Sequence, residues 1–141
     1  MSRVLLLDTG PLVAAINRRD RFHLWATELL GRIKPPIFTC EAVLAEACFL
    51  LQGTHGGSAA ILEFVRRGVL LPQFSLTEHA VSVARLMNKY ADVPMALADA
   101  CLVRMSELHD DCEVASFDSD FLIYRRNGRN TIPLTMPPEL C

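Results

Sequence analysis

The chain has 141 residues, of which 51% are hydrophobic and 21% charged, and its net charge is −2. This size and composition indicate one folded domain over residues 1–141 and exclude a disordered chain. No apolar run is long enough for a membrane span, and the few residues before Asp8 lack the features of a signal peptide. Five cysteines without a CxxC pair argue against a disulfide framework or a zinc site, and favour a reduced, cytoplasmic protein.

Strand-like and helix-like segments alternate along the chain. The continuous apolar run before Asp8 is typical of a buried strand. Pro11 suits the first turn of a helix, Thr39 and Ser58 are candidate N-caps, and Gly53 suits the end of the helix that Thr39 would begin. Strands are expected over residues 3–7, 35–39, 69–74, 113–117 and 131–134. Helices are expected over residues 12–17, 22–33, 40–52, 59–67, 76–90 and 95–108.

This alternation predicts the fold class. Strands that alternate with helices imply βαβ units, a short, mostly parallel central sheet and a three-layer α/β/α domain. In such sheets the functional site lies beyond the carboxyl ends of the strands. Asp8 directly follows the first predicted strand, and Asp118 follows the strand over 113–117. We therefore expect these two carboxylates at one edge of the sheet.

Two further acids occupy helix positions that a hydrophobic core would not favour. The residues three and four positions away from Glu46 are all apolar, and the same is true of Asp99. Any one of the four acids, taken alone, is explained by a surface position or a helix cap. Together they are four carboxylates without a basic partner nearby in sequence, which is costly to bury. A divalent cation such as Mg²⁺ or Mn²⁺, which prefers oxygen ligands, would resolve this cost.

Four stretches of the sequence then resemble a known family. LLLDTGPLVAAI, TCEAVLAEACFLL, MALADACLV and ASFDSDF are similar, in that order, to the acidic blocks of PIN domains. The similarity is greatest to the VapC-like ribonucleases of prokaryotic toxin–antitoxin systems. It implies a PIN-like fold and a metal-dependent endoribonuclease that cleaves RNA with metal-activated water. The catalytic and metal-binding acids implied by the resemblance are Asp8, Glu46, Asp99 and Asp118, with Thr9, Ser116 and Asp120 in supporting roles.

The sequence departs from the family pattern at two positions, and the resemblance also implies binding partners. Ser116 stands where a threonine is common, and Ala96 stands where some relatives carry a further acid, which would reduce metal affinity. Arg125 and Arg126 follow Asp118 closely and are the candidate phosphate contacts. The implied partners are RNA, a cognate antitoxin and a second copy of the chain in a homodimer, with no membrane.

Other classes of protein fit the sequence less well. A phosphatase of the haloacid dehalogenase type needs a second acid where Gly10 stands, and a receiver domain needs a late lysine that Lys34 and Lys89 do not provide. The alternative that stays open is a non-catalytic PIN module that binds RNA or a partner protein. The presence of all four principal acids favours the enzyme.

Overall fold

A parallel sheet of five short strands organises the molecule, in the order β3-β2-β1-β4-β7. The computed structural model describes residues 3–141. The central sheet consists of β1 (Val4–Leu7), β2 (Ile37–Phe38), β3 (Leu70–Leu71), β4 (Cys112–Ala115) and β7 (Leu134–Thr135). A separate antiparallel pair is formed by β5 (Arg125–Arg126) and β6 (Asn130–Thr131). All pairings within the central sheet are parallel, which confirms the predicted sheet.

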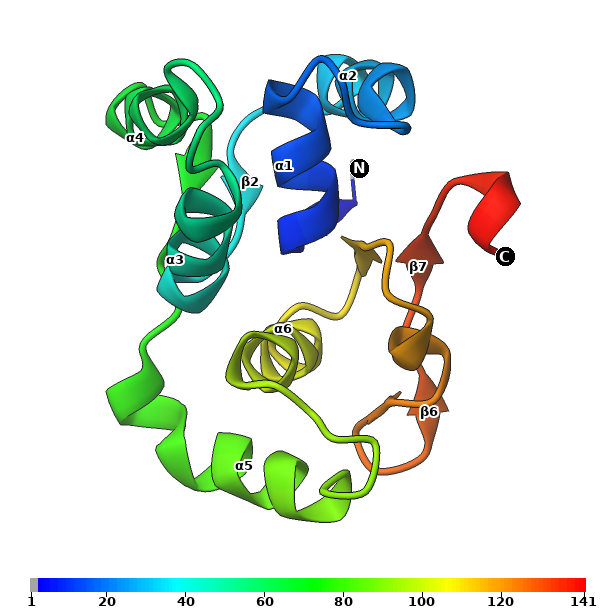
Figure 1. Ribbon diagram of the computed structural model, residues 1–141. Helices are drawn as coiled ribbons and strands as arrows, with labels where there is room; N and C mark the ends of the chain where they lie inside the picture. Colours follow the sequence, from blue (N-terminus) through cyan, green and yellow to red (C-terminus); the bar gives the residue numbers. More distant parts are fainter. Residues whose placement is uncertain (1–2) are drawn as a thin grey trace.

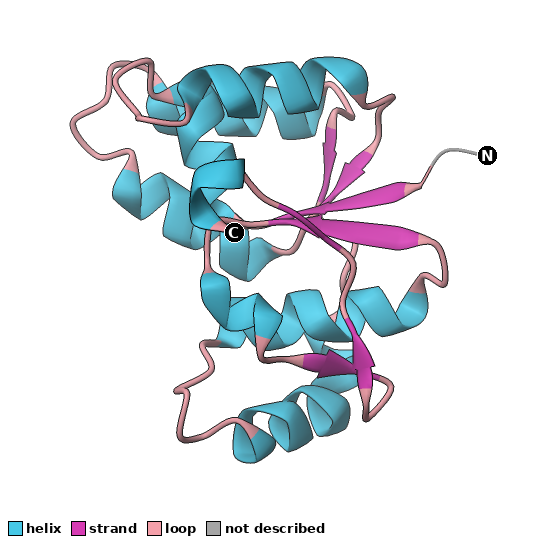
Figure 2. Ribbon diagram, turned by 90° about the vertical axis from the view of Figure 1, so that its right-hand side faces the viewer, coloured by secondary structure: helices cyan, strands magenta, loops and turns pink. Residues whose placement is uncertain are grey.

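Helices cover both faces of this sheet. The α-helices are α1 (Thr9–Ile16), α2 (His23–Arg32), α3 (Glu41–Leu50), α4 (Gly57–Arg66), α5 (Leu76–Lys89) and α6 (Leu97–Leu108). Two short 3₁₀ helices, η1 (Ser119–Leu122) and η2 (Pro138–Leu140), follow β4 and β7. Helices α1 and α2 lie on one side of the sheet, and α5 and α6 lie on the other, as Figures 1 and 2 show. The predicted three-layer α/β/α architecture is therefore confirmed.

The core forms around β1 and α6. Leu5, Leu6 and Leu7 of β1 are at most 1% exposed, because β1 lies in the middle of the sheet and has helices over both faces. Helix α6 contacts β1, β4, α3 and α5, so apolar residues cover almost its whole circumference. Among residues 3–141, no helix combines the length and the apolar character needed to cross a bilayer.

Two predicted helix caps are wrong. Cys40, not Thr39, precedes α3 as its N-cap. The Thr39 hydroxyl instead donates to the carbonyl of Leu7 at 2.9 Å, so it joins β2 to β1. Ser58 lies inside α4, which begins one residue earlier after Gly56 in a left-handed conformation with φ of 68°. The Thr39 error arises because a contact across the fold competes with the local capping preference.

The bounds of several segments also differ from the expectation, most clearly in three places. Helix α1 begins at Thr9, because the Asp8 carboxylate accepts its N–H and caps the helix. The strand expected over 69–74 shortens to the two residues of β3. The strand expected over 131–134 divides into the ends of β6 and β7, which belong to different sheets.

The register of β1 places functional side chains beside one another. Leu7 pairs with Ala115 of β4, so the next residues, Asp8 and Ser116, leave the sheet side by side. The backbone N–H of Asp8 continues the ladder by donating to Ala115 at 3.0 Å. An acid and a hydroxyl therefore lie together at the carboxyl ends of the strands, where functional sites of such sheets lie.

Candidate active site

A cleft of about 420 Å³ opens at this edge of the sheet. Its lining contains five carboxylates and no lysine, arginine or histidine among the residues that the structure describes. The lining residues are Asp8, Thr9, Gly10, Glu46, Leu50, Pro94, Ala96, Asp99, Phe117, Asp118 and Asp120. The structure thus brings together all four predicted acids and two of the three supporting residues. The third, Ser116, lies behind the cleft and reaches it through hydrogen bonds.

Asp8 is the most buried of these acids, with 7% of its surface exposed. The Ser116 hydroxyl donates to Asp8 Oδ2 at 2.7 Å, and the Thr9 N–H donates to Oδ1 at 2.8 Å. Burial raises the pKa of Asp8 to about 6, an effect that these two hydrogen bonds oppose and that the charges of Glu46 and Asp118 increase. Asp8 is therefore a fixed carboxylate whose charge costs free energy in the metal-free protein.

Asp99 is held from behind by a residue far along the chain. The hydroxyl of Tyr124, a fully buried side chain, donates to Asp99 Oδ2 at 2.9 Å. Burial raises the pKa of Asp99 to about 6 against the lowering effect of this bond, and the charges of Asp8 and Asp118 raise it further. The pKa of Tyr124 is raised in turn, first by burial and then by Asp99. The phenol therefore stays protonated and remains a donor to the carboxylate.

Asp118 and Asp120 belong to the turn that follows β4. Asp118 caps η1, where its Oδ1 accepts the N–H of Asp120 at 2.9 Å. The N–H of Asp118 donates to the Ser116 hydroxyl at 2.9 Å. One serine hydroxyl therefore connects Asp8 to the Asp118 turn. Burial, and then the charge of Asp118, raises the pKa of Asp120.

Glu46 lines the cleft from α3. It lies six residues after Cys40, the N-cap of α3, and its charge is among the causes that raise the pKa of Asp8. The contacts of α3 with both α1 and α6 explain how an acid in the middle of a helix can face the cleft. Within α3, Val43 and Ala47 are buried, whereas Glu46, Phe49 and Leu50 are exposed.

The chemistry of the cleft fits a hard divalent cation. Its donors are carboxylates and the hydroxyl of Thr9, whose Oγ1 is the one buried side-chain oxygen or nitrogen without a hydrogen-bond partner among residues 3–141. Within the same described residues, no three His, Cys, Asp or Glu side chains form a group that could hold a metal by themselves. Carboxylate and hydroxyl oxygens are the donors that Mg²⁺ or Mn²⁺ prefers, and these ions keep several waters and need few direct protein ligands.

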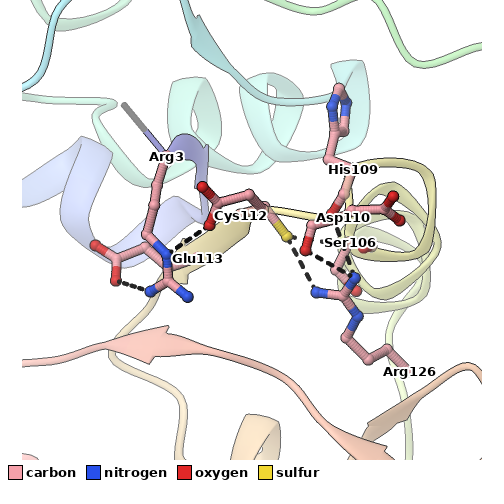
Figure 3. A network of polar contacts seen from close by, with 8 residues as sticks. Arg3, Ser106, His109, Asp110, Cys112, Glu113 and Arg126 are labelled. Carbon is pink, nitrogen blue, oxygen red and sulfur yellow. Dashed lines mark hydrogen bonds and ion pairs between the residues drawn. The ribbon is translucent and has the colours of Figure 1, made fainter. Parts of the chain in front are cut away.

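The structure changes the interpretation of Arg126. This side chain is 8% exposed, and its guanidinium donates to the carbonyls of His109 and Asp110 and to Cys112 Sγ, as Figure 3 shows. It therefore fixes the end of α6 to β4, away from the cleft. We correct the prediction accordingly and do not propose Arg126 as an RNA contact. Arg125 also donates to backbone carbonyls, those of residues 122–124, although it is less buried.

Two residues of the site were not found by sequence reasoning. Tyr124 is 25 positions from Asp99, so no local pattern connects them. Phe117 lines the cleft between two acids, yet in sequence it continues the apolar run of 113–117 and resembles a core residue. The position of Phe117 directly before Asp118 was the available signal, because a residue at a strand exit reaches the same edge as its neighbour.

Comparisons with known proteins bear on the family and the fold. The family model of the PIN domain matches residues 5–127. Among solved structures, the chain is similar to VapC20 of Mycobacterium tuberculosis, described as a toxin that cleaves the sarcin–ricin loop. The two share 20% sequence identity and a TM-score of 0.68, over 82% of this chain and 91% of VapC20, a likeness that establishes the fold. A search of curated proteins finds no match.

We expect Asp99→Asn to stabilise the metal-free protein near neutral pH. Because the pKa of Asp99 is raised from 3.8 to about 6, the folded state binds its proton more tightly than the unfolded chain. The stability that this proton contributes is complete below pH 3.8 and is lost as the pH rises through about 6. Asparagine keeps an acceptor for Tyr124, so the variant should gain about 1 to 2 kcal/mol at neutral pH.

Thermal denaturation in EDTA, at about pH 5 and about pH 7, measures this effect. The gap in melting temperature between variant and wild type should be wider at the higher pH. Glu28→Gln, which removes an exposed acid of α2, is the matched control and should show no gap. A lower melting temperature for Asp99→Asn at neutral pH would show instead that the charge itself stabilises the fold.

Proposed function

The chain belongs to the PIN-domain family, and we propose on that premise that it is a metal-dependent endoribonuclease. The observation that carries the proposal is the cleft, where five carboxylates meet and no basic side chain among the described residues lines the wall. Such an arrangement is unfavourable unless a cation enters it, since burial and mutual repulsion both oppose the charged forms. Burial first, and then the charges of neighbouring acids, raise the pKa values of Asp8 and Asp99.

The acids divide into proposed roles by position. Asp8, Glu46 and Asp99 are proposed to hold Mg²⁺ or Mn²⁺, and Asp118 to hold a second ion or its waters. When bound, the cation would supply an activated water and stabilise charge on the phosphate. Ser116 and Tyr124 support this arrangement by holding Asp8 and Asp99 through hydrogen bonds on their buried sides. The Thr9 hydroxyl, which has no partner among residues 3–141, can bind a water in the cleft.

The shape and charge of the cleft favour single-stranded or looped RNA. A duplex holds its backbone in a regular helix, whereas an unpaired segment can bend into a narrow cleft. The likeness to VapC20, a sarcin–ricin loop cleaving toxin, supports a looped substrate. On the same likeness we propose that the chain is the toxin of a type II toxin–antitoxin pair, with a cognate antitoxin and a homodimeric assembly, in the cytoplasm.

The proposed activity requires both the cation and the acids. Purified protein should cleave a mixed RNA pool, and an RNA hairpin of the sarcin–ricin loop, in Mg²⁺ or Mn²⁺. EDTA should abolish cleavage, and Asp8→Asn should lower the rate by at least about a hundredfold, because it removes a carboxylate that would bind the ion. Denaturing gels of end-labelled RNA measure both effects, with Glu28→Gln as the control for the loss of one exposed charge.

Three outcomes of this assay have different meanings. Cleavage that survives EDTA would contradict metal dependence, and full activity of Asp8→Asn would contradict the assigned site. RNA binding without cleavage in either metal would favour a non-catalytic PIN module. Co-purification with the protein encoded by the adjacent gene would separately test the antitoxin.

Tyr124→Phe should weaken Mn²⁺ binding without removing any carboxylate from the cleft. Phenylalanine keeps the ring packed against Phe121 and Tyr90, but loses the hydroxyl that holds Asp99. Loss of such an outer hydrogen bond to a metal ligand typically costs about tenfold or more in affinity. Isothermal titration of the RNA-free protein with Mn²⁺ measures the change.

The matched control for this experiment is Tyr90→Phe. Its hydroxyl accepts the backbone N–H of Arg125 and touches no carboxylate of the cleft, so the same chemical change should leave Mn²⁺ affinity as in the wild type. Equal affinities for the wild type and Tyr124→Phe would remove Tyr124 from the site. Equal losses in both variants would indicate a general loosening of the aromatic cluster.

A further inference from the structure

An aromatic side chain forms one wall of the acidic cleft. Phe117 directly precedes Asp118, and it is the one aromatic residue that lines the cleft among those described. Its ring centroid is 5.0 Å from that of Phe22 and 5.7 Å from that of Trp25, both near the start of α2. Phe117 is only partly buried, so part of the ring belongs to the cleft surface and part to this cluster.

Gly10 fixes the position of this ring. A Cβ added at Gly10 would lie 2.8 Å from Phe117 Cδ2 and 3.0 Å from Cγ, closer than real side chains approach. The ring therefore rests directly on the backbone of α1, while the aromatic residues of α2 support it from another side. A ring held in this way presents a fixed apolar surface beside the carboxylates of the cleft.

A free cation lies next to the same cluster. The guanidinium carbon of Arg21 lies 4.6 Å from the ring centroid of Phe22, and Arg21 is exposed. Within residues 3–141 it has no carboxylate within 4.0 Å, unlike Arg3, Arg66 and Arg104. The exposed residues Arg18 and Arg19 belong to the same connection between α1 and α2. The Phe117 ring of the acidic cleft thus contacts the Phe22 ring, and the Arg21 guanidinium lies over Phe22.

We propose that Phe117 is the stacking surface for one unpaired nucleobase of the RNA, with Arg21 contacting a phosphate that flanks it. The inference rests on the proposed function and names the part of the substrate that the protein holds. Aromatic side chains bind bases through their faces, and arginine binds the phosphates between them. The cleft itself repels phosphate, so an uncharged contact beside it is where RNA can gain affinity.

The chain contains a built-in probe for this subsite. Trp25 is its single tryptophan and contacts the Phe117 ring, so a base stacked on Phe117 should change Trp25 fluorescence. AMP is the test ligand, because it carries a base and a phosphate but no phosphodiester bond to cleave. Ribose 5-phosphate, which lacks the base, is the matched control. Both are titrated into the full-length protein in Mg²⁺.

We expect AMP to change the fluorescence saturably and ribose 5-phosphate to leave it unaltered. Phe117→Leu should weaken AMP binding about tenfold, and Phe117→Tyr should retain it, because tyrosine keeps the aromatic face. Arg21→Gln should weaken AMP binding by a smaller factor. Melting temperatures of all variants establish that each is folded, and Phe117→Tyr keeps the test decisive where Phe117→Leu is unstable.

Several results would overturn the subsite. Equal responses to AMP and ribose 5-phosphate would show that no base is recognised, and wild-type binding by a folded Phe117→Leu would place the base elsewhere. These results do not depend on RNA cleavage. If AMP binds as expected while the protein cleaves no RNA, the nucleobase subsite stands and the nuclease proposal fails. If the protein cleaves RNA but does not bind AMP, the subsite is rejected and the nuclease proposal stands.

Discussion

The hydrogen bond from Ser116 to Asp8 is the contact on which the site depends. Parallel pairing of β1 with β4 brings the two residues out of the sheet together, and the hydroxyl then donates to a carboxylate that is almost wholly buried. The same hydroxyl accepts the N–H of Asp118, so it sets the position of a second acid as well. A shift of one residue in the register would reverse the faces of β4 and separate these groups.

The remaining acids are positioned by the hydrophobic core. Helix α6 is buried against β1, β4 and α3, and this packing fixes the single face on which Asp99 meets the cleft. Helix α3 positions Glu46 through its contacts with α1 and α6. Apolar burial offsets the repulsion among the acids chiefly on α6, which buries six apolar residues around Asp99, whereas α3 buries only Val43 and Ala47 and leaves Glu46 exposed. A fold with such a core can hold charges together before any cation arrives.

The sequence was informative where a residue conflicts with its local surroundings. An acid that ends an apolar strand, such as Asp8, or interrupts an apolar helix face, such as Asp99, is visible without a structure, and the cleft contains both. Contacts between distant segments were not predictable in the same way. The hydroxyl of Thr39 fits a helix cap by every local rule, yet it bonds across to β1. Likewise Arg126 fits an RNA contact by composition, whereas the fold uses it to fix the end of α6.

The distribution of charge bears on how such a protein could engage RNA. With a net charge of −2, the whole molecule offers no general attraction for a polyanion. Affinity must therefore come from particular places, and the cleft repels phosphate until its carboxylates are neutralised. The exposed Arg21, in the connection between α1 and α2, lies beside the aromatic cluster and not in the lining of the cleft. Under the proposed function, the aromatic and basic surface would bind the RNA strand. The cleft, once it holds a cation, would act on the phosphodiester bond.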